Sequence, residues 1–284
     1  MHLGAEQKEG QAATPRDAAT VLLLRPAGRE FEVFMVKRSG LSDVLGEAHV
    51  FPGGKVDAAD ASADMLAQVA GVDQLDAAAL GEELPPDRLA AMFIAAARET
   101  FEEAGVLLAR SAGGTKLAAA RDRLNAKEGF APVLADLGVK LDLASLVPWV
   151  RWVTPSFLAR RFDARFFLAA APGDQQAMHD NYEATHSEWL SPQAALAGWE
   201  QGTIKLAPAT YMSLAHLATY ASIEAALADA RSRPAPIIEP HTFEVEGVRT
   251  LALPGDPTHA VKTRAIPGAT RLRWDGVRYA PVDG

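Results

Sequence analysis

The protein is a chain of 284 residues in which 28 Lys and Arg face 36 Asp and Glu, a formal net charge of −8. It has no cysteine, which excludes disulfides, thiolate metal sites and a cysteine nucleophile. No apolar run approaches the roughly 18 residues of a membrane span, and the first 20 residues lack a signal-peptide core, so a cytoplasmic protein is expected. The acidic balance also argues against binding nucleic acid. An anionic substrate therefore requires a bound metal rather than the net charge of the protein.

The N-terminal third begins with a polar stretch, residues 1–17, that is expected to be a flexible arm. Residues 19–39 predict two strands joined by a turn at Pro26–Gly28. Residues 61–86 are rich in alanine and end in two prolines, which predicts short helices inserted into the domain.

A strong helix should follow, with Asp87 as its N-cap and Gly105 just beyond its C-terminus. Apolar and small side chains recur on one face of this helix, while charged side chains occupy the other side. The predicted inner face consists of Phe93, Ala97, Thr100, Phe101 and Ala104.

The rest of the chain alternates between further helices and strands before a change in composition near residue 233. The last 50 residues are rich in Pro, Gly and β-branched residues, which predicts a small β appendage over 233–284 beside a main domain over 18–232. This appendage could pack on its own domain or on a second subunit of a homodimer. Helices are expected over 115–146, from Ser191 to Gly202 and over 208–231, and strands over 146–156, 160–172 and 182–190.

The stretch from Arg98 to Val106 carries the most informative chemistry. Glu99, Glu102 and Glu103 lie at helical spacings i, i+3 and i+4, so three carboxylates share one helical face and repel one another. One interpretation is an ordinary solvated surface. The other is a site for a hard cation, because clustered oxygen ligands suit Mg²⁺ or Mn²⁺.

These residues resemble the Nudix box of the Nudix hydrolases. Gly54 matches its first glycine and Asp60 its first acid, although glutamate is usual there; the segment from Arg98 matches its second half, with Thr100 at a hydrophobic position. An insertion of 30 residues separates the two halves, which costs little loop entropy if it leaves and rejoins the same place. The resemblance implies an α/β/α sandwich with a mixed, curved sheet.

A narrower resemblance is to the branch of that family that hydrolyses coenzyme A and its thioesters. It rests on the long insertion and on two phrases, residues 48–54 (AHVFPGG) and 161–167 (RFDARFF). A separate coenzyme A signature expects an arginine and a glycine before Phe-Pro-Gly-Gly, but Asp43 and Glu47 stand there. Hydrolysis of ADP-ribose, a nucleotide sugar or a dinucleotide therefore stays open, as does a catalytically silent nucleotide sensor.

The resemblance implies attack of water on the diphosphate of a nucleoside diphosphate linked to another group, with Mg²⁺ or Mn²⁺ as cofactor. By analogy Glu99 and Glu103 are metal ligands, Glu102 is a ligand or the general base, and Arg98 orients a carboxylate, either Asp60 or a metal-binding glutamate. Gly53 and Gly54 let the backbone approach the metal or phosphate closely.

Other candidates lie outside the box. Glu183 and Glu188 flank a late strand and could supply the general base, although ordinary surface acids are the simpler interpretation. Lys37 with Arg38, and Arg161 with its neighbour Arg160, could bind phosphates, although basic residues at strand ends are commonly just solvated.

Overall fold

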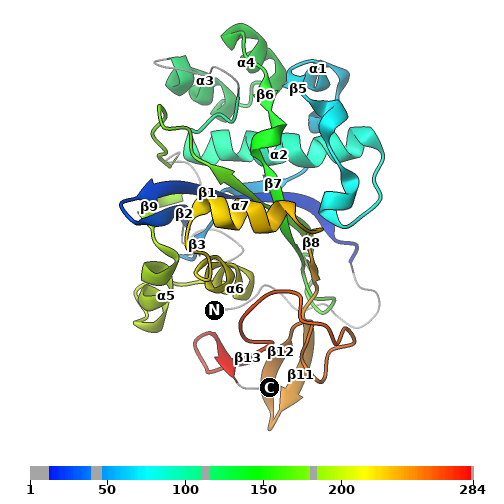
Figure 1. The fold of residues 1–284 in the computed structure, drawn as a ribbon, viewed down its shortest axis with the longest axis vertical. Helices are drawn as coiled ribbons and strands as arrows, with labels where there is room; N and C mark the ends of the chain where they lie inside the picture. The colour runs from blue at the N-terminus through cyan, green and yellow to red at the C-terminus, as the bar shows by residue number, and fades with distance from the viewer. Residues whose placement is uncertain (1–12, 40–46, 110–115, 180–183, 283–284) are drawn as a thin grey trace.

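The computed structural model describes residues 13–39, 47–109, 116–179 and 184–282. A large mixed sheet forms the centre of the molecule, and helices cover both of its faces (Figure 1). Its strands run in the order β10-β7-β8-β1-β2-β3, with β4 pairing with β1 and β9 with β2. They are β1 (Arg16–Ala27), β2 (Glu30–Arg38), β3 (His49–Val50), β4 (Gly53–Lys55), β7 (Val147–Val153), β8 (Phe162–Ala170), β9 (Ala184–Leu190) and β10 (Ile237–Ile238).

The sheet is mixed because β1 pairs with β8 and β10 with β7 in parallel, whereas the other pairs in it are antiparallel. Both faces of its central strands are buried, so β1 reads as a nearly continuous apolar run around Val21 to Leu24. Alternate residues enter two different cores, Val21 and Leu23 on one face and Leu22 and Leu24 on the other. The predicted α/β/α sandwich is confirmed.

One face of the sheet carries the longest helix, α2 (Pro86–Ala104), together with the insertion. The predicted inner face of α2 is buried in full, from Phe93 to Ala104. Its start differs from the prediction, since α2 begins at Pro86 and Asp87 lies in the first turn rather than at the cap. Proline suits the first helical position and an acid suits the first turn, which accounts for the shift. Gly105 ends the helix in the left-handed conformation, with φ of 69°.

The insertion packs into the core between the sheet and α2 and does not form a separate unit. It contains α1 (Ala63–Leu66), β5 (Val69–Ala70) and three short 3₁₀ segments, and it buries Met65, Val69 and Leu80 against α2. Glu82 binds Arg165 of β8, whose guanidinium is 2% exposed, at 2.8 Å. The 3₁₀ segments are η1 (Ala58–Ala61), η2 (Val72–Gln74) and η3 (Ala77–Leu80), and the same face also carries α3 (Lys116–Asn125), α4 (Phe130–Leu137), β6 (Leu141–Asp142) and η4 (Leu143–Ser145).

The opposite face carries α5 (Pro192–Glu200), α6 (Pro208–Leu217) and α7 (Ile223–Arg231). The single helix predicted over 208–231 is wrong, because residues 218–222 break it into α6 and α7. Ser222 caps the second helix by accepting a hydrogen bond from the Ala225 amide at 3.2 Å, which makes a new start favourable at that point.

A second sheet at the bottom of Figure 1 holds β11 (His241–Val245), β12 (Val248–Ala252), β13 (Arg271–Trp274) and β14 (Tyr279–Val282). Leu251 and Leu272 join the same core as α5–α7, and the Arg278 guanidinium stacks on Trp199 of α5 at 3.9 Å. The C-terminal sheet thus packs on its own chain.

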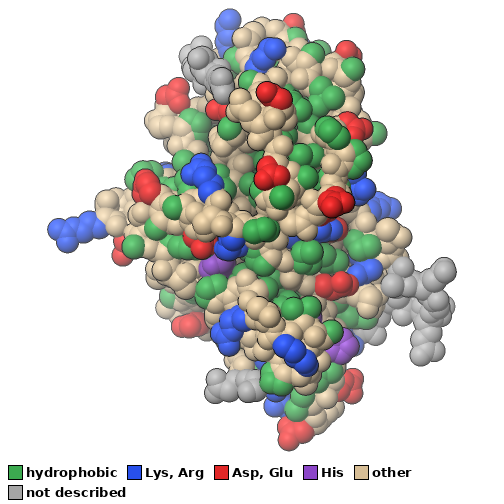
Figure 2. Space-filling model, turned by 45° about the vertical axis from the view of Figure 1, so that its right-hand side comes forward, with side chains coloured by type: hydrophobic (Ala, Val, Ile, Leu, Met, Phe, Trp, Pro, Cys, Tyr) green, Lys and Arg blue, Asp and Glu red, His purple; other side chains and the backbone are tan. Residues whose placement is uncertain are grey.

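Two predicted boundaries also differ in detail. β1 begins at Arg16 rather than after an arm ending at residue 17, and residues 1–12 of that arm lie outside the described part of the chain. β10, which follows the proposed domain boundary at 233, pairs with β7 and so belongs to the central sheet. No helix among the described residues is long and apolar enough to cross a membrane. On the face shown in Figure 2, basic side chains are scattered among acidic, apolar and uncharged ones.

Candidate active site

The two halves of the predicted motif meet around the Arg98 side chain. Its Nε and Nη2 atoms donate to both carboxylate oxygens of Asp60, at 2.9 and 3.1 Å. Asp60 is 1% exposed and Arg98 is 8% exposed, so this is a buried bidentate pair. Removing one partner of such a pair costs about 3–5 kcal/mol. The two ends of the insertion, after Asp60 and before Arg98, therefore lie close together, as the match to the two halves of the motif required.

Arg98 also binds the acidic face of its own helix. Its Nη1 atom donates to Glu99 Oε1 at 2.8 Å and to Glu102 Oε1 at 3.2 Å, and Nη2 donates to the Lys55 carbonyl at 2.9 Å. Burial lowers the pKa of Arg98, but the bond to Asp60 and the nearby carboxylates raise it more, so the net shift is upward. Arg98 thus stays charged and contacts both kinds of expected partner, Asp60 and the glutamates of its own helix.

The glycine pair brings backbone into contact with these carboxylates. The Gly53 amide donates to Glu103 Oε2 at 2.9 Å. A Cβ atom placed on Gly54 would lie 2.3 Å from Glu99 Oε1, so any side chain there would collide with the carboxylate. A Cβ on Gly53 would instead lie 2.5 Å from the Ala19 carbonyl oxygen of β1. Both positions therefore need glycine, but for different neighbours.

The environment of the glutamates suits a hard cation. Burial raises the pKa of Glu99 to about 7, and the charge of Glu102 adds to this effect against the opposing influence of Arg98. Among the described residues no group of three His, Asp or Glu stands in the arrangement of a metal site, and Arg98 and the Gly53 amide engage the carboxylates. The donors themselves are oxygens, the type that Mg²⁺ and Mn²⁺ prefer, and the bare Gly54 backbone leaves room for Glu99. The residues present fit such an ion.

Thr100 explains how this motif tolerates a polar residue at a hydrophobic position. Its side chain is fully buried, and its hydroxyl donates to the Ala96 carbonyl at 2.7 Å within the helix. The hydroxyl is therefore satisfied locally, and the methyl group remains for packing.

A cavity of about 770 Å³ opens beside the acidic face of α2. Its lining includes Gly53, Gly54, the three glutamates of α2 and five basic residues. The remaining walls are mostly apolar and come from β7, β8, the start of α6 and the C-terminal region. The basic residues in the lining are Arg38, Lys55, Arg98, Lys127 and Arg160.

Some of the predicted phosphate-binding residues are placed elsewhere. Arg161 does not line the cavity; it is buried and donates to the carbonyls of Thr154 and Ala13 and to Glu239. Its neighbour Arg160, in the bend that precedes β8, lines the cavity instead. Lys37 likewise lies outside the cavity lining and pairs with Glu47 at 2.8 Å, whereas Arg38 lines it.

Of the two candidate bases outside the motif, the structure describes one, Glu188. Glu188 on β9 lies outside the cavity lining and pairs with His49 Nε2 at 3.2 Å. Burial lowers the pKa of His49, although the charge of Glu188 opposes this shift. Glu183 lies outside the described residues. Of the candidate bases among the described residues, Glu102 lines the cavity and Glu188 does not.

Sequence reasoning missed Lys55 and Lys127. Lys55 directly follows the glycine pair, and this adjacency could have identified it. Lys127 lies beyond the end of α3 and carries no sequence signal, since only the packing of α3 against α2 and α4 brings it to the cavity.

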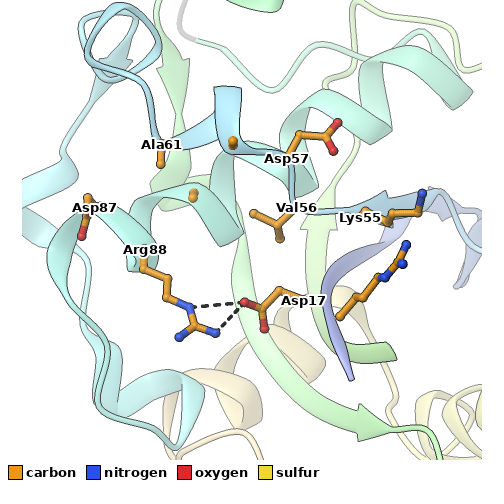
Figure 3. A pocket seen from close by; sticks show the side chains of 10 residues that line it. Asp17, Lys55, Val56, Asp57, Ala61, Asp87 and Arg88 are labelled. Atoms are coloured by element: carbon orange, nitrogen blue, oxygen red, sulfur yellow. Dashed lines mark hydrogen bonds and ion pairs between the residues drawn. The ribbon is translucent and has the colours of Figure 1, made fainter. Parts of the chain in front are cut away.

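A second hollow of about 520 Å³ lies on the other side of Lys55 and Asp57. Figure 3 shows Arg88 donating across it to Asp17, at 2.6 Å. Its charges are balanced, with Arg16, Lys55 and Arg88 facing Asp17, Asp57 and Asp87. We assign no reactant to this hollow.

Comparison with known proteins agrees with this geometry. The family model described as NUDT19 Nudix domain matches residues 68–217, just over half of the chain. The chain is 30% identical over 263 residues to acyl-coenzyme A diphosphatase NUDT19 of Gallus gallus, covering 73% of this chain and 69% of that protein. It is 32% identical over 240 residues to the protein of the same name from Homo sapiens, covering 70% and 63%.

A solved structure supports the fold as well. The NUDIX hydrolase from Alicyclobacillus acidocaldarius superposes with a TM-score of 0.63 at 28% identity, covering 78% of this chain and 97% of that one. The bidentate Arg98–Asp60 pair, the glycine pair against Glu99 and the matching family model all lead to one assignment: the chain belongs to the NUDT19 Nudix domain family.

Proposed function

We propose that this chain is a metal-dependent Nudix diphosphatase that hydrolyses coenzyme A or acyl-coenzyme A. The observation that carries the proposal is the cluster in which Arg98 joins Asp60, Glu99 and Glu102, with Arg98 and both glutamates in the lining of a large cavity. The curated relatives named acyl-coenzyme A diphosphatase support the substrate class.

In this reaction water attacks a phosphorus atom of the diphosphate, and the anhydride bond breaks. The products are adenosine 3′,5′-bisphosphate and 4′-phosphopantetheine or its acylated form. Glu99 and Glu103, with Glu102, would hold Mg²⁺ or Mn²⁺, which supplies Lewis acidity and lowers the pKa of bound water. If Glu102 is not itself a metal ligand, it would accept the proton of the attacking water, either directly or through a second water; its position in the cavity lining supports this role.

The basic residues of the cavity lining supply the remaining charge. A diphosphate is strongly anionic, and the protein carries a net charge of −8. Arg38, Lys55, Lys127 and Arg160 line the same cavity as the carboxylates, and their side chains are of the type that pairs with phosphate oxygens. Arg98 does not need to contact substrate, because its donors hold Asp60 and the two glutamates in position.

The test is a substrate panel with purified protein, Mg²⁺ or Mn²⁺, and products identified by mass spectrometry. We expect coenzyme A or an acyl-coenzyme A to be cleaved at the diphosphate. Turnover of ADP-ribose but not of coenzyme A would reject the substrate assignment. Metal binding without turnover of any diphosphate would instead favour a nucleotide sensor. The cytoplasmic location and a homodimer remain proposals, to be tested by fractionation and by light scattering.

A further inference from the structure

One wall of the active-site cavity is a face of the central sheet, and a row of paired residues crosses it. Ala18 of β1 pairs with Lys55 of β4 on one side and with Ala164 of β8 on the other. Ala164 pairs in turn with Trp152 of β7. Directly paired residues project from the same face of a sheet, and all four line the cavity. At about 4.8 Å for each strand step, the row spans about 14 Å.

The side chains in the middle of this row are small, and those on either side of it are larger. Ala18 and Ala164 present only methyl groups, whereas the neighbours two residues away along the same strands are larger. Phe162 flanks Ala164 on one side and Phe166 on the other, and Thr20 lies beside Phe166 in the pairing of β1 with β8. All three line the cavity. The two alanines therefore form the floor of a trough that runs across the strands.

The C-terminal region borders the trough at its Trp152 end. Ile238 of β10 pairs with Trp152, so Pro240 lies just beyond this pair. Pro240 and Leu251 of β12 both line the cavity, and Leu251 is 2% exposed. The ion pair of Glu239 with Arg161, at 2.7 Å, anchors the chain beside them. The sheet β11–β14 thus contributes directly to the cavity wall.

We propose that this trough holds the pantetheine arm of coenzyme A, with the acyl end directed toward Leu251 and Pro240. This inference rests on the proposed function. The trough starts at Lys55, next to Gly54 and the carboxylates, where the diphosphate must lie for hydrolysis. Beyond Lys55 the row itself carries no charge, which suits the uncharged arm and not the nucleotide half with its 3′-phosphate. Burial of apolar groups of the arm and acyl chain is favourable there.

The test fills the floor of the trough with the substitution Ala164→Phe. The matched control is Ala170→Phe, on the same strand and, six residues on, the same face, where the side chain is exposed and outside the cavity. Each half of the substrate serves as a probe: 4′-phosphopantetheine and adenosine 3′,5′-bisphosphate are measured by calorimetry and as inhibitors of hydrolysis. We expect Ala164→Phe to weaken binding of 4′-phosphopantetheine about tenfold or more and to leave the nucleotide probe unchanged. Ala170→Phe should change neither.

The opposite pattern, weaker nucleotide binding with unchanged 4′-phosphopantetheine binding, would overturn the inference. Unchanged binding of both probes in a folded Ala164→Phe protein would overturn it equally. Circular dichroism and thermal melting check the fold, and Ala164→Leu provides a smaller obstruction if the phenylalanine variant unfolds. If the unsubstituted protein fails to hydrolyse coenzyme A, the proposed function fails, whereas hydrolysis with the wrong probe affected refutes only the trough assignment.

Discussion

Gly54 offers the sharpest test of the proposed active site, because one methyl group there would displace the Glu99 carboxylate. In a Gly54→Ala variant the new Cβ would lie 2.3 Å from Glu99 Oε1, 2.4 Å from Cδ and 2.6 Å from Oε2. Ordinary contact between such atoms begins near 3.5 Å, so the carboxylate must move by about 1 Å. Gly54 does not have a positive φ, and the alanine therefore adds no backbone strain.

A displacement of this size at a reacting centre typically lowers the rate about 100-fold. This corresponds to about 2.7 kcal/mol of transition-state stabilisation. The assay is steady-state hydrolysis of coenzyme A across a titration of Mn²⁺, with thermal melting to monitor the fold. We expect a reduced kcat and a weaker apparent affinity for Mn²⁺, with a nearly unchanged melting temperature.

Alanine variants of two further glycines serve as controls for Gly54→Ala. In Gly53→Ala the new Cβ would meet the Ala19 carbonyl oxygen of β1 at 2.5 Å, so this variant should lose stability as well as activity. In Gly173→Ala nothing lies within 4 Å, so this variant should behave as the unsubstituted protein. Full activity of a folded Gly54→Ala enzyme would refute the assignment of Glu99 to the site.

Three further predictions address the metal face, the corrected arginine and the response to pH. Glu103→Gln should lower turnover by orders of magnitude with little change in melting temperature; survival of activity would show that α2 is not the metal site. Arg160→Met should raise the KM for coenzyme A without unfolding the protein. Arg161→Met should instead lower the free energy of unfolding by about 1–3 kcal/mol, because its carbonyl partners and Glu239 lose their donors. The reverse pattern, measured by kinetics and urea unfolding, would contradict the placement of Arg160 in the cavity and of Arg161 outside it. Burial lowers the pKa of His216 from 6.5 to about 4, so the unfolded chain binds more protons than the folded protein between these values, and stability should fall by about 2 kcal/mol from pH 7 to pH 5. Urea unfolding of His216→Gln should lack this part of the slope, and an identical slope would contradict it.

The acidic helix could be predicted from the sequence because its signals are local. A periodic apolar face, proline at the start and glycine at the end define α2 without reference to the rest of the chain. The motif residues follow from this helix, since their spacing places Glu99, Glu102 and Glu103 on one face whatever surrounds them. The contact between Arg98 and Asp60 could also be predicted, because both halves of the motif were recognisable on either side of the insertion.

The phosphate-binding residues could not be assigned in this way. Arg160 and Arg161 are neighbours of the same type, and the path of the backbone through the bend before β8 decides which of them lines the cavity. Lys37 and Arg38 show the same ambiguity, which their environment resolves in favour of Arg38. The break between α6 and α7 was missed for a related reason, because alanine-rich sequence continued through it.

By itself the sequence determined the acidic helix, because periodicity and capping act over short distances, and its resemblance to the Nudix box implied the family and the sandwich of helices and sheet. Only the tertiary structure decided which charged residues share the cavity and that the C-terminal sheet borders it. It also revealed the trough, because Lys55, Ala18, Ala164 and Trp152 are far apart along the chain and only strand register aligns them. Register is a property of the paired sheet, which no single strand encodes.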